Sequence, residues 1–269
     1  MVRRRLPVWA VVRRSYSYVW EHRTLFGVPL LLVFLIQLVE RVYIQQTMFA
    51  GGSTQIALLE QSSLVTLNLV ALAFSMSVVV GTHRTVLLDD VRSGFGFLRW
   101  DRHLLSYFGT SLILGFTLIF VGVLIAIVLL SVFGVRAFFP AVAVVALVVV
   151  ALALRLMLAL PAAALGDDDR LRFSWKATEG NWLRLAAAAI LTMLPLMIAE
   201  AVTVFMLVSL AETAMHSTPH QLKEPIAILV VLAAIRAVSL VVLTIMVSLS
   251  YDVLVRGGGP PEKQEFSAS

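Results

Sequence analysis

Apolar residues in this sequence form six long runs separated by short polar segments. Each run has about 20 residues or more, which is the length that an α-helix needs to cross about 30 Å of hydrocarbon. The last four runs exceed that length, so we expect tilt or extension beyond the bilayer. The pattern predicts an all-α, polytopic membrane protein with six transmembrane helices, at Leu25–Ile44, Ser62–Thr82, Leu104–Phe133, Phe138–Leu165, Leu183–Leu210 and Pro225–Val255.

The runs divide the chain into three parts. Residues 1–24 carry aromatic and basic side chains and are predicted to form a cytoplasmic, amphipathic segment at the membrane surface. Residues 25–255 are the transmembrane domain, and the first run is too long for a signal-peptide core, so we interpret it as a retained span. Residues 256–269 contain a Gly-Gly-Gly-Pro-Pro sequence and are predicted to be a flexible cytoplasmic tail.

Basic residues outside the runs or at their ends predict the orientation. Sixteen Lys and Arg residues fall in or next to the N-terminal segment, the second and fourth connections and the tail, against three (Arg41, Arg136 and Lys223) in or next to the first, third and fifth connections. Because Lys and Arg accumulate on the cytoplasmic side, both termini are expected there.

Composition supports a membrane protein and narrows its chemistry. Hydrophobic residues make up 60% of the chain and charged residues 14%, whereas soluble domains have about 45–50% and about 25%. The net charge of +5 is concentrated beside the apolar runs, which favours anionic lipid headgroups over nucleic acid as the partner. With no cysteine, the chain can form neither a disulfide nor a thiolate metal site.

Aromatic side chains mark segments ahead of the first, third and fifth runs. In Leu6–His22, the residues Val8, Trp9, Val12, Tyr16, Val19 and Trp20 fall on one side of a helix. Either these segments are separate helices in the headgroup plane, or they are ordinary extensions of the spans with an aromatic belt. The predicted interfacial anchors are Trp9, Tyr16, Trp20, Trp100, Trp175 and Trp182.

The same segments suggest an internal repeat. Trp20-Glu21-His22-Arg23 and Trp100-Asp101-Arg102-His103 stand 80 residues apart, and Glu179-Gly180-Asn181-Trp182 follows after nearly 80 more. The spacing fits three units of interfacial segment plus helical hairpin. Shared interfacial residue preferences explain the pattern equally well.

Five polar residues within the runs are candidate site residues. Glu200 and Arg236 each lie about 24 Å from the cytoplasmic ends of their helices and are expected to pair. Arg155 lies about 18 Å deep, near the layer of Gln37 and Asn68. One interpretation is a polar cavity for an anionic headgroup or solute. We favour an Arg–Glu lock between the fifth and sixth helices, with Arg155 snorkelling or bonded to carbonyls.

Other clusters point away from metals and cofactors. Asp167, Asp168 and Asp169 are expected to form a solvated turn with helix-capping residues, because no calcium-loop pattern follows them. Two histidines in the fifth connection, His216 and His220, have ligand spacing, but Pro219 separates them. His83 and His103 are expected at the membrane interface. No phosphate loop, nucleophile elbow or dinucleotide fingerprint occurs, so neither metal nor cofactor is expected.

Two segments resemble a known family. Residues 155–185 read RLMLALPAAALGDDDRLRFSWKATEGNWLRL, and residues 81–88 read GTHRTVLL. They resemble the membrane domain fused to some bacterial glycerophosphodiester phosphodiesterases, and related stand-alone six-helix proteobacterial membrane proteins without assigned activity. The resemblance implies a six-helix fold in a bacterial inner membrane. No stretch between the runs is long enough for the catalytic barrel of the fused enzymes, so phosphodiesterase activity is not implied.

The expected function is therefore a non-enzymatic scaffold or accessory subunit of a membrane complex, engaging lipid or a protein partner, or assembling as a homo-oligomer. The alternative is a transporter or channel for a small anionic or amphiphilic solute that passes through the layer of Arg155 and Arg236.

Overall fold

A computed structural model describes residues 5–49, 54–92, 94–134, 138–167, 169–217 and 226–257, and these residues are helical with no β-strand among them. In chain order the elements are α1 (Val8–Glu21), α2 (Arg23–Phe49), α3 (Thr54–Leu88), the 3₁₀ turn η1 (Gly94–Phe97), α4 (Arg102–Phe133), α5 (Phe138–Leu156), α6 (Ala159–Leu165), α7 (Arg170–Ala177), α8 (Trp182–Ser217), α9 (Ile226–Tyr251) and the π-helical turn η3 (Asp252–Arg256).

Six segments in the described part of the chain are long and apolar enough to cross a membrane, as the sequence predicts. They are Arg23–Tyr43, Ser63–Leu88, Arg102–Phe133, Phe138–Leu165, Trp182–Met206 and Ala227–Arg256. The largest difference from prediction is in α3, which continues as a helix to Leu88 rather than ending near Thr82. The all-α fold class is confirmed.

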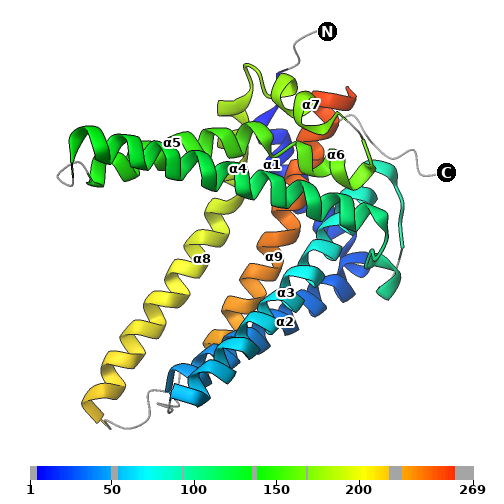
Figure 1. Ribbon diagram of the computed structural model, residues 1–269. Coiled ribbons are helices and arrows are strands. Elements are labelled where there is room, and N and C mark those ends of the chain that lie inside the picture. Colours follow the sequence, from blue (N-terminus) through cyan, green and yellow to red (C-terminus); the bar gives the residue numbers. More distant parts are fainter. Residues whose placement is uncertain are drawn as a thin grey trace.

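Helix α9 is the centre of the main bundle, in contact with α1, α2, α3 and α8 (Figure 1). Its buried face begins at Leu229, includes the small residues Ala233 and Ala237 and continues through Ile245 and Met246. Between helices in lipid, close packing around small residues replaces the hydrophobic driving force that water provides. The sequence of α9 therefore explains why four other helices gather on it.

The α4–α5 hairpin lies crosswise to α2, α3, α8 and α9 in Figure 1 and projects away from them. Its two helices pack against each other, and Val145 and Val149 of α5 face Gly122 of α4. Its remaining surface is apolar on several sides, with exposed side chains that include Phe116, Phe120, Val132, Phe139 and Leu147. A helix pair that is apolar all round is stable only where lipid or protein covers it.

The fourth run is two helices rather than one, because a proline lies within it. Pro161 has no N–H, and its ring would clash with the carbonyl of Met157 in a continuous helix. The chain accordingly turns at Met157 and Leu158, between α5 and α6. The carbonyl of Arg155, near the end of α5, accepts hydrogen bonds from Ser174 Oγ of α7 (2.6 Å) and from Oγ1 of Thr178, the residue that follows α7 (3.3 Å). Pro161 thus positions α7 against the end of α5.

Helix α1 is separate from α2, as one of the two interpretations of this segment requires. Val11, Val12, Ser15 and Tyr18 are the buried residues of α1, which packs against α8 and α9. Trp9 and Trp20, two of the predicted interfacial anchors, are 70% and 72% exposed. Helix α1 therefore buries one side in the protein and leaves these two tryptophans outside it.

The order of elements agrees with a repeat without establishing one. Helix α1 precedes α2–α3, η1 precedes α4–α5, and α6–α7 precede α8–α9. These leading elements differ in form, so the equivalence of three units stays a prediction.

Candidate functional site

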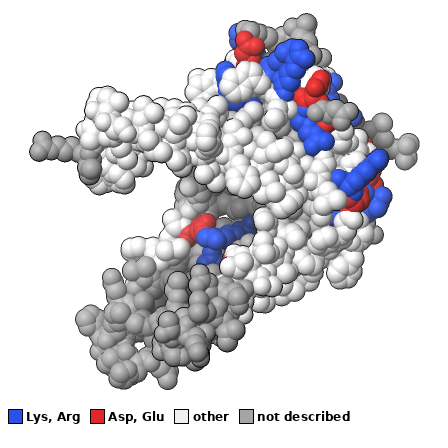
Figure 2. All heavy atoms as spheres, in the orientation of Figure 1, with Lys and Arg blue, Asp and Glu red and all other residues white. Residues whose placement is uncertain are grey.

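Charged side chains gather at the end of the molecule that holds α6, α7 and the chain termini (Figures 1 and 2). We call this region the polar end layer. It combines residues from α3, the segment around η1, the α6–α7 connection and the end of α9: His83, Arg84, Asp90, Arg99, Asp167, Arg170, Tyr251 and Arg256.

Asp90 is the electrostatic centre of the polar end layer. Its carboxylate lies 3.2 Å from Arg84 Nη2 and 3.4 Å from Arg92 Nε, and it also accepts a hydrogen bond from Arg99. The Arg99 side chain is only 3% exposed. Partial burial alone would raise the pKa of Asp90, but the hydrogen bonds and charges of Arg99, Arg84 and Arg92 outweigh it and hold that pKa below its ordinary value. Asp90 is therefore ionised and holds three arginine side chains together.

The contacts around Asp90 connect the η1 segment to α3 and α6. Arg84 also donates to the carbonyl of Ala164 in α6 (3.3 Å), and Ser77 donates to the carbonyl of Arg99 (3.0 Å). Gly81 permits the close approach of η1, because a Cβ there would lie 2.5 Å from the Phe97 carbonyl oxygen and 2.8 Å from its ring. Only glycine fits this position without movement of one of the two segments.

His83 is buried within the protein. It is 2% exposed, and its Nδ1 lies 2.7 Å from Ser248 Oγ of α9. The Ser248 hydroxyl also lies 2.8 Å from the Thr244 carbonyl of its own helix. The pair of His83 and Ser248 therefore joins α3 to α9.

The carboxyl end of α9 is tied to two other elements. Tyr251 donates to Asp167 Oδ2 (2.6 Å), and Arg256 donates to the carbonyl of Leu87. Asp167 is therefore bonded across the fold rather than part of a purely solvated turn. Asp169 occupies the N-cap position of α7, but its side chain makes no capping hydrogen bond. Asp168 lies outside the described residues.

Arg155 contacts α7. Its guanidinium stacks over the Trp175 ring, with the Arg155 Cζ 4.4 Å from the ring centroid. Asn68 is exposed and donates to the Leu64 carbonyl of its own helix (2.8 Å). Gln37 is half-buried on α2. A polar layer that contains all three residues stays a prediction.

The predicted ion pair between Glu200 and Arg236 is confirmed. Arg236 Nε and Nη2 each lie 3.0 Å from Glu200 Oε1, and they join α8 to α9. The Arg236 side chain is 52% exposed and that of Glu200 is 33% exposed. The pair is thus formed on an open face of the bundle rather than in an enclosed interior.

The predicted anchors differ in exposure. Trp9, Trp20, Trp100 and Trp175 are exposed, as a membrane-interface role requires, and Trp175 also stacks with Arg155. Tyr16 instead directs its hydroxyl to the Thr192 carbonyl of α8.

Trp182 and the histidines His216 and His220 are the remaining residues that the sequence singled out. Trp182 is half-buried at the start of α8. The candidate pair His216 and His220 lies outside the side chains that the structure describes. Elsewhere in the described chain, no group of three or more metal-binding side chains occurs.

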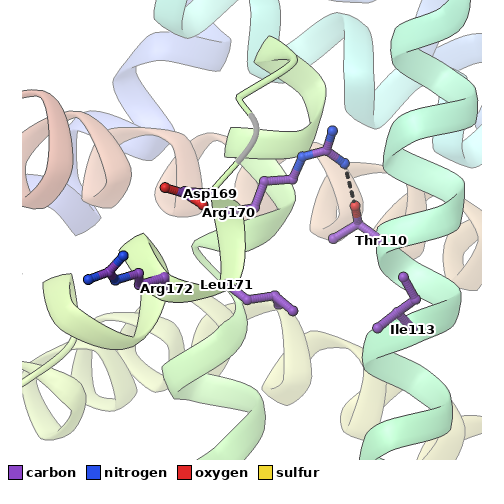
Figure 3. A pocket seen from close by; sticks show the side chains of 6 residues that line it. All are labelled: Thr110, Ile113, Asp169, Arg170, Leu171 and Arg172. Carbon is purple, nitrogen blue, oxygen red and sulfur yellow. Dashed lines mark hydrogen bonds between the residues drawn. The ribbon is translucent and has the colours of Figure 1, made fainter.

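A cavity of about 350 Å³ opens between α4 and α7 beside the polar end layer (Figure 3). Thr110, Ile113, Asp169, Arg170, Leu171 and Arg172 line it. Arg170 Nη1 lies 2.8 Å from Thr110 Oγ1, the contact drawn as a dashed line in the figure.

Sequence reasoning missed Asp90, Arg99 and Tyr251 as members of the polar end layer, and it missed Ser248 as the partner of His83. The segment of residues 81–88 could have pointed to this region, because its Gly81 contacts η1 and its His83 contacts α9. Comparison with protein-family models, with curated proteins and with solved structures finds no match.

Proposed function

We propose that this protein is a non-catalytic module of a bacterial inner membrane, acting as a scaffold or accessory subunit of a membrane complex. In this proposal the polar end layer faces the cytoplasm and both termini lie on that side. The apolar helices contact lipid or a protein partner. The resemblance of residues 81–88 and 155–185 to a membrane domain that accompanies separate catalytic domains supports the same role.

The proposal rests on the hydrogen bonds and ion pairs of the polar end layer, which are made within the protein. The carboxylate of Asp90 is occupied by three arginines, and Asp167 accepts from Tyr251. The His83 ring is bonded to Ser248. These bonds connect elements with one another, which rigidifies the end from which the α4–α5 hairpin projects. A rigid base with a projecting apolar hairpin suits a protein that positions a neighbour.

Membrane orientation is tested with reporter fusions to the full chain. Fusions after Gly51 and Ser217 should report the periplasm, and fusions after Gly94, Asp168 and Gly259 should report the cytoplasm. The expectation follows from the excess of basic residues at the polar end layer. A periplasmic signal from any of the last three would reject this orientation.

The scaffold role is tested by photo-crosslinking in native membranes. A photoreactive amino acid replaces Phe120 of α4 or Phe139 of α5, which are 68% and 82% exposed, and Ile245 of α9, which is buried, serves as the matched control. Both hairpin positions should give one and the same protein adduct of constant mass, and the control should give none. Adducts with lipid alone at both hairpin positions would contradict a protein-scaffold role.

A second candidate, transport of a small anionic or amphiphilic solute, is favoured by the half-exposed Glu200–Arg236 pair within apolar helices. The chain has no cysteine, so an Arg236→Cys variant reports this position alone. If lipid or a partner covers the pair, a membrane-impermeant thiol reagent should not label it from either side. Fast labelling that a candidate solute blocks would replace the scaffold proposal with a transporter.

A further inference from the structure

The long helices of this protein run in two different directions. In Figure 1, α2, α3, α8 and α9 run from the polar end layer in a common direction, whereas the α4–α5 hairpin lies crosswise to them. A bilayer has a single normal, and a helix that crosses it is tilted by at most about 40° from that normal. The two sets of helices therefore cannot both cross the same membrane in this arrangement.

The four bundle helices set the membrane normal. Helix α9 enters the polar end layer only with its last residues, where Tyr251 bonds to Asp167. Arg236 lies 15 residues earlier on the same helix, which is about 22 Å away from the layer. Charged residues that gather at one end of four long apolar helices are typical of a bundle that crosses a membrane.

Helix α4 begins along the polar end layer instead of leaving it. Its His103 ring lies beside Gly166, 3.3 Å from the position that a Cβ on this glycine would take. Thr110 lies seven residues later, about 10 Å further along the helix, and its Oγ1 still bonds to Arg170 of the same layer (2.8 Å). A helix that ran down the bundle would have left the layer before Thr110.

The outer part of the hairpin is apolar and packs only on itself. Beyond Leu114 the buried residue of α4 is Gly122, which faces α5. Thr117 and Ser131 are the only polar side chains of α4 in this part, and the Thr117 hydroxyl bonds within its own helix. A helix pair with this surface is stable in hydrocarbon and not in water or among headgroups.

One leaflet of a bilayer has room for such a hairpin. Its hydrocarbon is about 15 Å thick, half of a core of about 30 Å, and an α-helix with its side chains is about 10–12 Å in diameter. A hairpin that starts at the polar end layer and runs crosswise to the bundle therefore fits into the leaflet on that side.

The basic residues of the sequence agree with this placement. Arg136 is the basic residue of the connection between the third and fourth runs. A hairpin that does not cross brings this connection to the cytoplasmic side, where Lys and Arg accumulate. The excess of basic residues on that side then rises from sixteen against three to seventeen against two.

We propose that α2, α3, α8 and α9 cross the membrane and that the α4–α5 hairpin lies in the membrane plane, among the acyl chains of the cytoplasmic leaflet. The third and fourth apolar runs thus enter and leave on one side, although each is long enough to cross. The inference rests on the orientation in the proposed function, and it requires a protein partner of the hairpin to lie in the same leaflet.

The first test measures depth in liposomes with single spin-labelled cysteines in this Cys-free chain. Phe116, Val123 and Ile127 of α4 are exposed and lie on one helix face, and Ile190, Met197 and Ala201 of α8 have the same spacing. Accessibility to oxygen and to a water-soluble nickel chelate gives the depth of each label. The α4 labels should share one depth within about 5 Å, whereas the same spacing rises about 16 Å along the spanning α8. A depth profile along α4 as steep as that along α8 would overturn the proposal.

The second test asks whether the tip of the hairpin reaches the periplasm. Phe139→Cys places a thiol near the start of α5, at a position that is 82% exposed. A membrane-impermeant thiol reagent added from the periplasmic side should label a Ser217→Cys control and leave both Phe139→Cys and the cytoplasmic control Lys176→Cys unlabelled. Labelling of Phe139→Cys as fast as Ser217→Cys would show that the hairpin crosses.

Failure of this placement and failure of the proposed function give different results. A hairpin that crosses leaves the reporter signals after Gly94 and Asp168 and the crosslinking from Phe120 unchanged. A reversed orientation would instead label Lys176→Cys and not Ser217→Cys.

Discussion

The close approach of η1 to α3 at Gly81 makes a Gly81→Ala substitution a sharp test of the packing. The added Cβ would lie 2.5 Å from the Phe97 carbonyl oxygen and 2.8 and 2.9 Å from two atoms of the Phe97 ring. Real Cβ contacts with such atoms essentially begin above 3.0 Å. Phe97 cannot simply move away, because it is 1% exposed and packs edge-on against Phe26 of α2, with 5.7 Å between ring centroids.

The magnitude follows from two opposing terms. Overpacking of this kind costs about 1–3 kcal/mol, and the clamped position of Phe97 places the cost near the upper value. Alanine is favoured over glycine within a helix by about 0.8–1.0 kcal/mol, which offsets part of it. Gly109→Ala in α4 gains the same helix term, and a Cβ there meets nothing within 4 Å. The two variants should therefore differ by about 3 kcal/mol.

The assay is thermal denaturation of the full chain in one detergent, followed by intrinsic fluorescence and by loss of the monodisperse peak in size-exclusion chromatography. A difference of about 3 kcal/mol corresponds to roughly 6–12 °C for a protein of this size. Gly81→Ala should melt well below the parent protein, and Gly109→Ala at or above it. Equal melting temperatures for the two variants would refute the close contact between η1 and α3.

Substitutions at three further places test the contacts of the charged side chains. Glu200→Gln and Arg236→Gln should each lower thermal stability in detergent, with a coupling energy of about 0.5–1.5 kcal/mol in the double mutant; strictly additive losses would show that the pair does not form. Asp90→Asn should cost about 2–3 kcal/mol at pH 7, somewhat less than a fully buried pair. Because the folded pKa of Asp90 is lowered, this cost should persist down to about pH 4 and vanish only as the pH falls further, through the folded pKa; a cost already lost at pH 6 would contradict the lowered pKa. Arg155→Gln should cost about 0.5–1 kcal/mol by removing the cation over Trp175, and Arg155→Lys less; a larger loss for lysine would argue against the stacked geometry.

Sequence reasoning predicted the spans well because apolar length is a local signal. The limits of Leu104–Phe133 and Phe138–Leu165 agree with the helical segments within a few residues. The pairing of Glu200 with Arg236 was also within reach, since equal depth on consecutive helices restricts partners strongly. These predictions needed only distances measured along a helix.

The polar end layer could not be predicted in the same way. The contacts of His83 with Ser248 and of Asp167 with Tyr251 join residues 165 and 84 positions apart. Each depends on how α9 is rotated and placed, which no periodicity specifies. The stacking of Arg155 on Trp175 was missed for a different reason, because the fourth run was treated as one helix, whereas the chain turns before Pro161.

The carbonyl of Arg155 has a consequence for the order in which the chain is assembled. Its hydrogen-bond donors, Ser174 and Thr178, lie 19 and 23 residues later in the chain. At about 5–20 residues per second, a ribosome supplies them roughly 1–5 s after Arg155. The two hydrogen bonds between α5 and α7 can therefore form only after Thr178 has been synthesised. Docking of α7 on the end of α5 is thus a later step in biosynthesis than synthesis of the α4–α5 hairpin.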